Sequence, residues 1–374
     1  MKVLVFCGNL KVGGAQAVAA HIAQYAPDDM QVDYVVFGRD VGEYEPVVEA
    51  CGSRVFHVSV RKRRPLDYLK KMKTIIRDGQ YDVVHAHTMF SCGTVAVAAW
   101  RGGAPGRISH SHTSRKGSGG SGLVHDVYRF FRRRIVRGFS TEYLACGVDA
   151  GGALYGDRFF ARHGTVLQNG IDMKPYAYSP ETRERIRAQY DATDRFVIGH
   201  VGHYLPVKNQ VFLVRLMPEI LKKQPNALLL LFGDGESSEE LSKLVSELDL
   251  SDSVRLVGNV DNVSEVLSAM DVFAFPSLFE GTPLALIEAQ ANGVPCIISD
   301  AIPKDAWLTD LIEPLSLSES PSVWADRIVS AARRPDHDYA ADMAAHYDDI
   351  QTSMNKLYAI YDKYHRREKH GGNV

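Results

Sequence analysis

Short apolar runs alternate with longer amphipathic segments along the whole chain. In the first half, runs rich in valine, leucine and phenylalanine predict strands at 3–6, 33–37, 55–58, 83–85, 107–111 and 143–146. Apolar residues at helical spacing predict helices between them at 16–26, 66–77, 93–100 and 123–136. Strands that are apolar throughout indicate parallel sheets covered on both faces.

The second half repeats this pattern. Strands are predicted at 196–201, 227–232, 254–257, 272–276 and 296–299, and helices at 210–223, 238–248, 263–270, 283–292 and 322–333. The alternation predicts an α/β protein with two doubly wound, Rossmann-like parallel-sheet domains. Asn-Gly, two prolines and tyrosines interrupt the pattern around 169–180. We therefore expect domains at 1–175 and 176–349, followed by a last helix at about 350–366.

Composition narrows the function classes. A chain of 374 residues with 45% hydrophobic and 24% charged residues is typical of a globular protein of two domains. The net charge of −2 argues against bulk nucleic-acid binding. Five cysteines without a Cys-x-x-Cys pair, most of them in apolar runs, indicate reduced, buried thiols of a cytoplasmic protein. No apolar run approaches the roughly 20 residues of a membrane-spanning helix.

The segment 275–289 carries the strongest chemical signal. A buried strand is followed by the turn Glu280-Gly281-Thr282, and Thr282 can cap a helix that has Pro283 at its first position. The start of this helix, at Pro283 and Leu284, directs free N–H groups towards a phosphate. Glu280, and Glu288 eight positions later, would repel phosphate and more plausibly bind hydroxyl groups. Phosphate together with hydroxyls indicates a nucleotide-sugar.

Other candidate residues also follow predicted strands. Gly13-Gly14 opens a helix and would let the backbone approach a ligand, although a simple turn explains the pair equally well. Lys208 can reach a diphosphate as a point charge. Histidines gather at strand ends, at positions 85, 87, 110, 112, 200 and 203. Alternation along a strand puts His85 and His87 on one face, and likewise His110 and His112. Such pairs could bind zinc, but we rank a zinc site below a sugar site because no cysteine or acidic cluster completes a tetrahedral ligand set.

Two further motifs invite a functional interpretation. Asp336-His337-Asp338 spells the Asp-x-Asp motif of some metal sites, but it lies in a polar linker and is interpreted as a helix start. In the segment 128–137, aromatic residues accompany an arginine cluster, Arg129 to Arg137. This composition suits the surface of an anionic membrane, or else arginine stems packed on the core.

Together these residues resemble the GT4 family of retaining glycosyltransferases with the GT-B fold. The Glu280-to-Glu288 segment resembles the family's Glu-x7-Glu signature most closely. Supporting matches are Gly13-Gly14, the run 81–88, Asn169-Gly170-Ile171-Asp172, Lys208-Asn209 and Gly233-Asp234-Gly235. The run 108–113, with Ala145-Cys146-Gly147, looks most like the capsular and exopolysaccharide transferases of that family.

The resemblance implies roles within two domains that face each other across a cleft. Lys208 would hold the donor diphosphate with the amides after Glu280, and Glu280 and Glu288 would bind sugar and ribose hydroxyls. His112, or else His110, would be the active-site histidine. His87 and Asn169 are secondary candidates. Gly13-Gly14 would let the first domain close over the donor, and the last helix would pack back on the first domain.

The implied reaction moves a hexosyl group from a nucleotide diphosphate sugar, UDP-linked in our prediction, to a lipid-linked or saccharide acceptor. No cofactor or metal is expected. The family usually has an arginine where this chain has His203, which predicts weaker or pH-dependent donor binding, or a different grip on the phosphate. An epimerase-like enzyme of the same fold and a non-catalytic, transferase-like subunit are the alternatives. The expected location is cytoplasmic, with peripheral contact to a membrane through Arg129 to Arg137.

Overall fold

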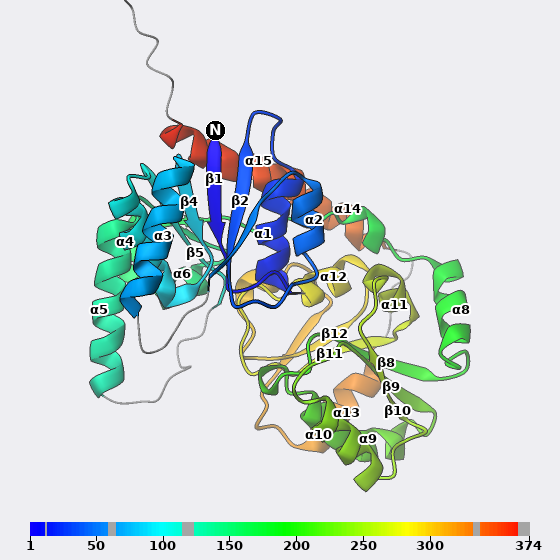
Figure 1. Cartoon of the computed structure of the whole chain (residues 1–374). Helices are drawn as coiled ribbons and strands as arrows, with labels where there is room; N and C mark the ends of the chain where they lie inside the picture. Colours follow the sequence, from blue (N-terminus) through cyan, green and yellow to red (C-terminus); the bar gives the residue numbers. More distant parts are fainter. Residues whose placement is uncertain (12, 59–64, 114–122, 332–336, 366–374) are drawn as a thin grey trace, which may run out of the picture. The chain divides into compact units, whose positions relative to one another are not determined.

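The computed structural model describes residues 1–11, 13–58, 65–113, 123–331 and 337–365. It divides into two compact units, which are described separately (Figure 1). The first unit contains Met1–Ile171 and the chain from Asp348 onward, and the second contains Asp172–Tyr347. The sequence placed the corresponding divisions at 175 and 349.

The first unit is built on a parallel sheet with the strand order β3-β2-β1-β4-β5-β6-β7. Its strands are β1 Lys2–Phe6, β2 Gln31–Phe37, β3 Val55–Val58, β4 Val83–Ala86, β5 Gly106–Ser111, β6 Glu142–Ala145 and β7 Thr165–Val166. Its helices are α1 Gly14–Gln24, α2 Glu45–Ala50, α3 Pro65–Gly79, α4 Cys92–Gly102, α5 Leu123–Phe139, α6 Val148–Tyr155, α7 Asp157–His163 and α15 Ile350–Tyr361.

Alternate residues of β1, β2 and β4 enter two cores on opposite faces of this sheet. In β1, Leu4 and Phe6 face the core formed with α3, α4, α5 and α6. Val3 and Val5 face the core formed with α1, α2 and α15. Both faces of the sheet are therefore covered, as the apolar strands predict.

The last helix packs on the first unit. Figure 1 shows α15, in red, alongside α1 and the first strands, in blue. Leu357 and Tyr361 are fully buried in that core, and the hydroxyl of Tyr358 donates a hydrogen bond of 3.1 Å to the carbonyl of Ile22. The apolar face of this helix thus has its burial partner.

The second unit repeats the arrangement with the order β10-β9-β8-β11-β12-β13. Its strands are β8 Phe196–Val201, β9 Ala227–Phe232, β10 Val254–Gly258, β11 Val272–Phe275, β12 Cys296–Ser299 and β13 Ile312–Leu315. Its helices are α8 Pro180–Gln189, α9 Gln210–Lys223, α10 Ser238–Glu247, α11 Val263–Ala269, α12 Leu284–Ala291, α13 Pro321–Ser330 and α14 Tyr339–Ala344. Helices α9, α10 and α13 cover one face, and α8, α11 and α12 the other.

These observations confirm the predicted fold class, two doubly wound parallel α/β units. The cysteines are all free thiols, although Cys51 is exposed rather than buried. Within the described ranges, no helix is both long enough and apolar enough to cross a membrane.

Candidate functional site

Both sheets reverse their winding direction between two adjacent strands, and the candidate residues gather after those strands. In the second unit the reversal lies between β8 and β11, which pair in parallel. Doubly wound sheets bind ligands at the carboxyl ends of the strands at such a point, because the two connections leave in opposite directions. The loop after β8 carries Lys208, and the loop after β11 carries Glu280.

Lys208 and Glu280 form an ion pair. The Lys208 ammonium lies 2.8 Å from Oε1 of Glu280, and both side chains are mostly buried. The same ammonium lies 5.4 Å from the centre of the Phe275 ring. Two hydrogen bonds join the loops: the amide of Leu278 donates to the carbonyl of Val207 at 2.8 Å, and Nδ2 of Asn209 donates to the carbonyl of Pro276 at 3.2 Å. The lysine is therefore held beside the turn that contains Glu280.

The helix after this turn begins one residue later than the sequence predicts. Pro283 has a non-helical ψ of 85° and is the N-cap of α12, with no side-chain capping bond. The prediction that Thr282 caps the helix and that Pro283 is its first residue was therefore wrong. The Pro283 carbonyl accepts from the amides of Leu286 and Ile287, whereas first-turn amides, such as that of Leu284, have no partner within a helix. The start of α12 thus still offers N–H groups beside Gly281 and Glu280.

Glu288 lies in α12, partly buried, where Tyr176 donates a hydrogen bond to it. Burial raises the pKa of the Glu288 carboxyl, and the bond from Tyr176 opposes that rise. The sequence reasoning did not find Tyr176, because a tyrosine in the segment before α8 of the second unit carries no signal for this contact.

The loop that carries His203 is pressed against the loop after β9. The amide of Tyr204 donates to the carbonyl of Asp234 at 3.0 Å, and Nε2 of Gln210 donates to the carbonyl of His203 at 2.8 Å. Gly233 has a φ of 137°, and a Cβ there would lie 2.2 Å from the carbonyl oxygen of Gly202. The glycines of Gly233-Asp234-Gly235 therefore allow this close approach.

In the first unit the reversal lies between β1 and β4. Gly13 is the N-cap of α1 and Gly14 is its first residue; α1 is the helix that follows β1 along the chain. Asn169 follows β7, is buried, and has an Oδ1 without a hydrogen-bond partner in the described part of the chain.

The histidines at the carboxyl ends of β4 and β5 lie together, as the alternation predicts. His85, His87, His110 and His112, which we call the histidine cluster, have neighbouring ring centres 4.1 to 5.3 Å apart. Nδ1 of His87 lies 2.7 Å from Nε2 of His112. Burial lowers the pKa of His112 to about 4 and holds those of the other three well below the usual range. The rings are therefore neutral near pH 7.

Tyr361 contacts this cluster and was missed by the sequence reasoning. Its hydroxyl lies 2.6 Å from Nδ1 of His85. In the sequence Tyr361 is one position of an apolar helical stripe with Leu357, and no local signal distinguishes it from a purely packing residue. His200, in contrast, is a structural residue: it is fully buried in β8, and its Nδ1 lies 2.9 Å from the carbonyl of Ala274.

Three arginines of α5 bond to backbone carbonyls of their own unit. Arg132 donates to Phe90, Arg133 to Gly152 and Ala153, and Arg137 to Tyr155. These three are largely structural, which supports the alternative of arginine stems packed on the core. Arg134 is exposed, with its guanidinium 5.0 Å from the centre of the Phe130 ring.

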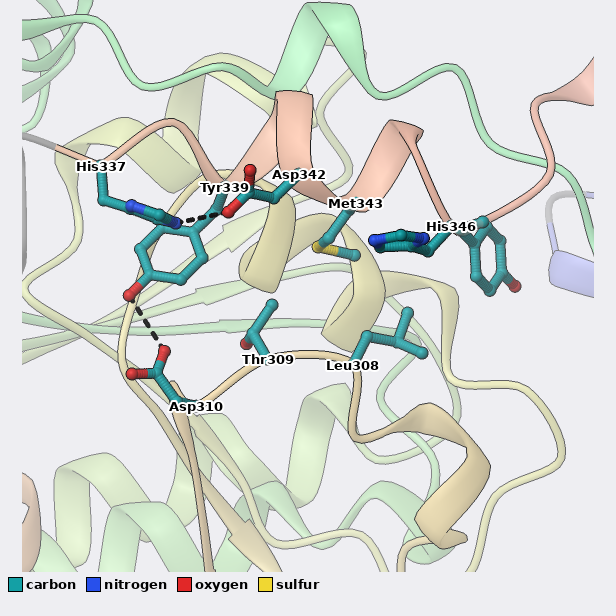
Figure 2. A pocket seen from close by; sticks show the side chains of 9 residues that line it. Leu308, Thr309, Asp310, His337, Tyr339, Asp342, Met343 and His346 are labelled. Carbon is teal, nitrogen blue, oxygen red and sulfur yellow. Dashed lines mark hydrogen bonds and ion pairs between the residues drawn. The ribbon is translucent and has the colours of Figure 1, made fainter.

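A pocket of about 620 Å³ lies elsewhere in the second unit, around α14 (Figure 2). His337 lies 2.7 Å from a carboxylate oxygen of Asp342, and the Tyr339 hydroxyl donates to Asp310 at 3.1 Å. None of the predicted site residues lines this pocket. Asp338 caps α14 by accepting from the amide of Ala341, which confirms that residue as a helix start; Asp336 lies outside the described residues.

Comparison with known proteins identifies the family. The family model for group 1 glycosyl transferases matches residues 182–305, and that for glycosyltransferase family 4 matches residues 12–175. The chain is 33% identical over 371 residues to the putative glycosyltransferase EpsF of Bacillus subtilis, covering 96% of each chain. It is 26% identical over 306 residues to an Escherichia coli enzyme named UDP-Gal:alpha-D-GlcNAc-diphosphoundecaprenol alpha-1,3-galactosyltransferase, covering 77% of this chain and 76% of that one.

Solved structures agree on the fold. Anabaena HepE in complex with UDP and glucose has a TM-score of 0.81 at 18% identity, covering 97% of this chain and 100% of that one. WaaG, a glycosyltransferase of lipopolysaccharide biosynthesis, has a TM-score of 0.67 at 15% identity, covering 98% and 100%. Both share the GT-B architecture of two parallel-sheet α/β domains. With the full-length match to EpsF and the two family models, this chain belongs to the GT4 family of glycosyltransferases.

Proposed function

We propose that this chain transfers a hexosyl group from a UDP-sugar to a lipid-linked or saccharide acceptor in the synthesis of a surface polysaccharide, with retention of anomeric configuration. The observation that carries the proposal is the placement of Lys208 and Glu280 at the sheet reversal, next to the start of α12. The names of EpsF, of the capsular polysaccharide transferase CapH of Staphylococcus aureus and of the Escherichia coli galactosyltransferase support the substrate classes.

The diphosphate would replace Glu280 as the partner of Lys208. The ammonium and the first-turn amides of α12 stabilise the negative charge that develops on the leaving group. Since these groups supply positive potential, the proposed donor site needs no metal. Glu280, released from Lys208, accepts hydrogen bonds from sugar hydroxyls, and Glu288 accepts them from the ribose.

The neutral ring of His112 in the first unit serves the transferred sugar in this proposal. A buried neutral imidazole donates or accepts a hydrogen bond without placing a positive charge next to an oxocarbenium-like sugar. His110, His87 and Asn169 are secondary candidates. His203, which stands where the family usually has an arginine, leaves Lys208 as the main cation for the diphosphate.

Binding of UDP separates the roles of the ion-pair residues. Lys208→Met should weaken UDP binding about 10- to 100-fold, since a charged hydrogen bond contributes roughly 1.5–3 kcal/mol. Glu280→Gln should keep UDP binding, because it frees Lys208, but should abolish sugar transfer. Calorimetry with UDP measures the first effect, and Lys243→Met, at an exposed lysine, is the matched control. Unchanged UDP binding in Lys208→Met would disprove the phosphate site.

Product analysis distinguishes the proposal from its alternatives. Incubation with UDP-sugars should release UDP and elongate an acceptor, with the anomeric configuration read by NMR. An epimerase-like enzyme would change the sugar without an acceptor, and a non-catalytic subunit would bind but turn nothing over. His112→Ala should abolish transfer while UDP binding, tested in the same samples, stays within about twofold.

An exposed apolar face on α5 supports peripheral membrane contact. Val127, Tyr128, Phe130, Phe131 and Ile135 are 36% to 60% exposed, and they accompany the exposed cation Arg134. Aromatic residues next to a cation suit the headgroup region of an anionic membrane. We therefore assign this contact to the exposed face rather than to Arg132 and Arg133, which bond to backbone carbonyls.

Liposome sedimentation tests this contact. The double variant Phe130→Ser/Phe131→Ser and the single variant Arg134→Gln should each lower association with anionic vesicles at least about fivefold, roughly 1 kcal/mol. Val148→Ser, at another exposed apolar side chain of the same unit, is the control. Equal sedimentation of all variants would count against membrane contact by α5.

A further inference from the structure

The histidine cluster concentrates unsatisfied nitrogen atoms in a buried place. His85 is fully buried and His110 is 1% exposed. Nε2 of His85, Nε2 of His87 and both ring nitrogens of His110 have no hydrogen-bond partner among the residues with described side chains. A buried polar atom left without a partner costs roughly 1–3 kcal/mol, and native proteins hold few of them. Four such nitrogen atoms in one cluster indicate that a ligand binds there.

The distances between these atoms suit a shared ion. One nitrogen each from His85, His87 and His110 lie within 4.8 Å of one another. Imidazole nitrogens bound at 2.0–2.1 Å to a tetrahedral zinc ion are roughly 3.4 Å apart. Ring rotations that move each nitrogen by about an ångström would therefore bring the three nitrogens to binding distance of one ion.

Two contacts can hold the rings as ligands when the proton of each ring is on Nδ1. With the proton of His85 on Nδ1, that N–H donates to the Tyr361 oxygen and leaves a lone pair on Nε2. With the proton of His87 on Nδ1, that N–H donates to Nε2 of His112 and again leaves Nε2 free. Metal-binding histidines typically use their second nitrogen in this way, which fixes the tautomer and the ring orientation.

The chemistry of the cluster favours a cation over an anion. The neutral form of an imidazole offers one nitrogen lone pair to a metal ion. Imidazole prefers zinc, copper, nickel and iron over magnesium or calcium. The three residues whose nitrogens lie close together are all histidines, and none is a carboxylate.

We propose that His85, His87 and His110 bind a divalent transition-metal ion, with zinc as the reference ion, in a three-histidine site oriented by Tyr361 and His112. Three protein ligands leave a fourth position for water or another ligand. The site lies wholly within the first unit. It shares His87 and His110 with the secondary candidates for the transferred sugar, but zinc binding is measured without donor or acceptor, so its failure and that of the proposed function are distinguishable. Its ion would fix the ring of His87 and, through it, that of His112.

Metal titration of the full chain, without a polyhistidine tag and stripped with a chelator, tests the proposal. Zinc, measured by competition with a chromogenic chelator, should bind at one ion per chain, and Co²⁺ should give visible absorption of a nitrogen-ligated site. His110→Asn and His85→Gln should lower zinc affinity more than 100-fold. His346→Ala, at an exposed histidine of the second unit, should leave it unchanged.

Tyr361→Phe tests the proposal with little risk to folding, because it removes only the hydroxyl that contacts His85. It should lower zinc affinity about 10- to 100-fold, as loss of an orienting partner does, while circular dichroism stays unchanged. The proposal is overturned if the wild-type chain does not bind zinc stoichiometrically, or if a folded His85→Gln/His110→Asn variant binds it as tightly as the wild type. An unchanged affinity in Tyr361→Phe would remove the orienting role of the tyrosine.

Discussion

The protonation state of a buried residue depends on its surroundings, and His200 is an example in this protein. Its ring stacks on Phe275 with the centres 5.6 Å apart, and Nε2 of Gln210 lies 3.3 Å from its Nε2. Burial lowers the pKa of His200 to about 4, and the positive charge of Lys208 adds to that effect, against the bond to Ala274. The folded state therefore keeps this ring neutral.

This shift predicts acid sensitivity of the second unit. Between about pH 6.5 and 4 the unfolded chain binds a proton at His200 that the folded chain does not, so stability falls as pH falls, by about 1.4 kcal/mol per pH unit. Above about pH 6.5 the residue has no effect. In His200→Gln this loss of stability on acidification should be absent, although we expect the variant to be less stable than the parent at pH 7.

Urea unfolding at pH 7, 6 and 5 measures the effect. Trp100 belongs to the first unit, and the other two of the three tryptophans, Trp307 and Trp324, to the second, so a Trp100→Phe background reports fluorescence from the second unit alone. An equal loss of stability on acidification in His200→Gln and in the parent would contradict the prediction. His346→Gln serves as the exposed control.

At the scale of elements, the candidate donor site depends on the loops after β8 and β9, whose backbones touch at Gly202 and Gly233. Gly233→Ala should destabilise the second unit by more than about 1 kcal/mol, because its Cβ would overlap the Gly202 carbonyl and its φ is 137°. It should also weaken UDP binding, since Lys208 follows the displaced loop. Urea unfolding and calorimetry with UDP measure the two effects.

Gly103→Ala, in the first unit, is the matched control for this prediction. Gly103 has a φ of 82°, but no heavy atom lies within 4 Å of the position that a Cβ would take there. It should therefore show backbone strain without loss of UDP affinity. Equal UDP binding in both variants would mean that contact between the loops does not position Lys208.

At the scale of the whole molecule, the first unit is discontinuous in sequence. The chain leaves it after Ile171 and returns at Asp348, and α15 fills part of its core. The stability of this unit therefore depends on residues nearly two hundred positions downstream. A mutation in α15 should act on the first unit and not on the second.

Leu357→Ala should destabilise the first unit by about 2–5 kcal/mol, the usual cost of a large cavity in a core. Ile360→Ala, at a half-buried position of the same helix, should cost less. Hydrogen exchange should show faster opening of β1 and α1, while unfolding of the second unit, followed by fluorescence in the Trp100→Phe background, stays unchanged. Faster exchange in β8 and β9 instead would contradict this assignment.

The sequence by itself determined the strands that are buried on both faces. The predicted bounds of β8, β9 and β12 agree with the structure, because an apolar run between turn residues has few alternatives. It missed β13, where Glu313 and Pro314 interrupt the run, which an edge strand tolerates. It missed α8, whose residues are almost all polar, and α6, which contains two glycines.

Only the tertiary structure decided which side chains meet. The sequence named Lys208, Glu280 and the paired histidines, because loops after parallel strands share one edge of a sheet. It could not show that Lys208 pairs with Glu280, that Tyr361 reaches His85, or that Tyr176 reaches Glu288. These contacts join residues 72, 276 and 112 positions apart, a separation over which periodicity carries no information. Local pattern determines the elements, whereas their packing determines the chemistry.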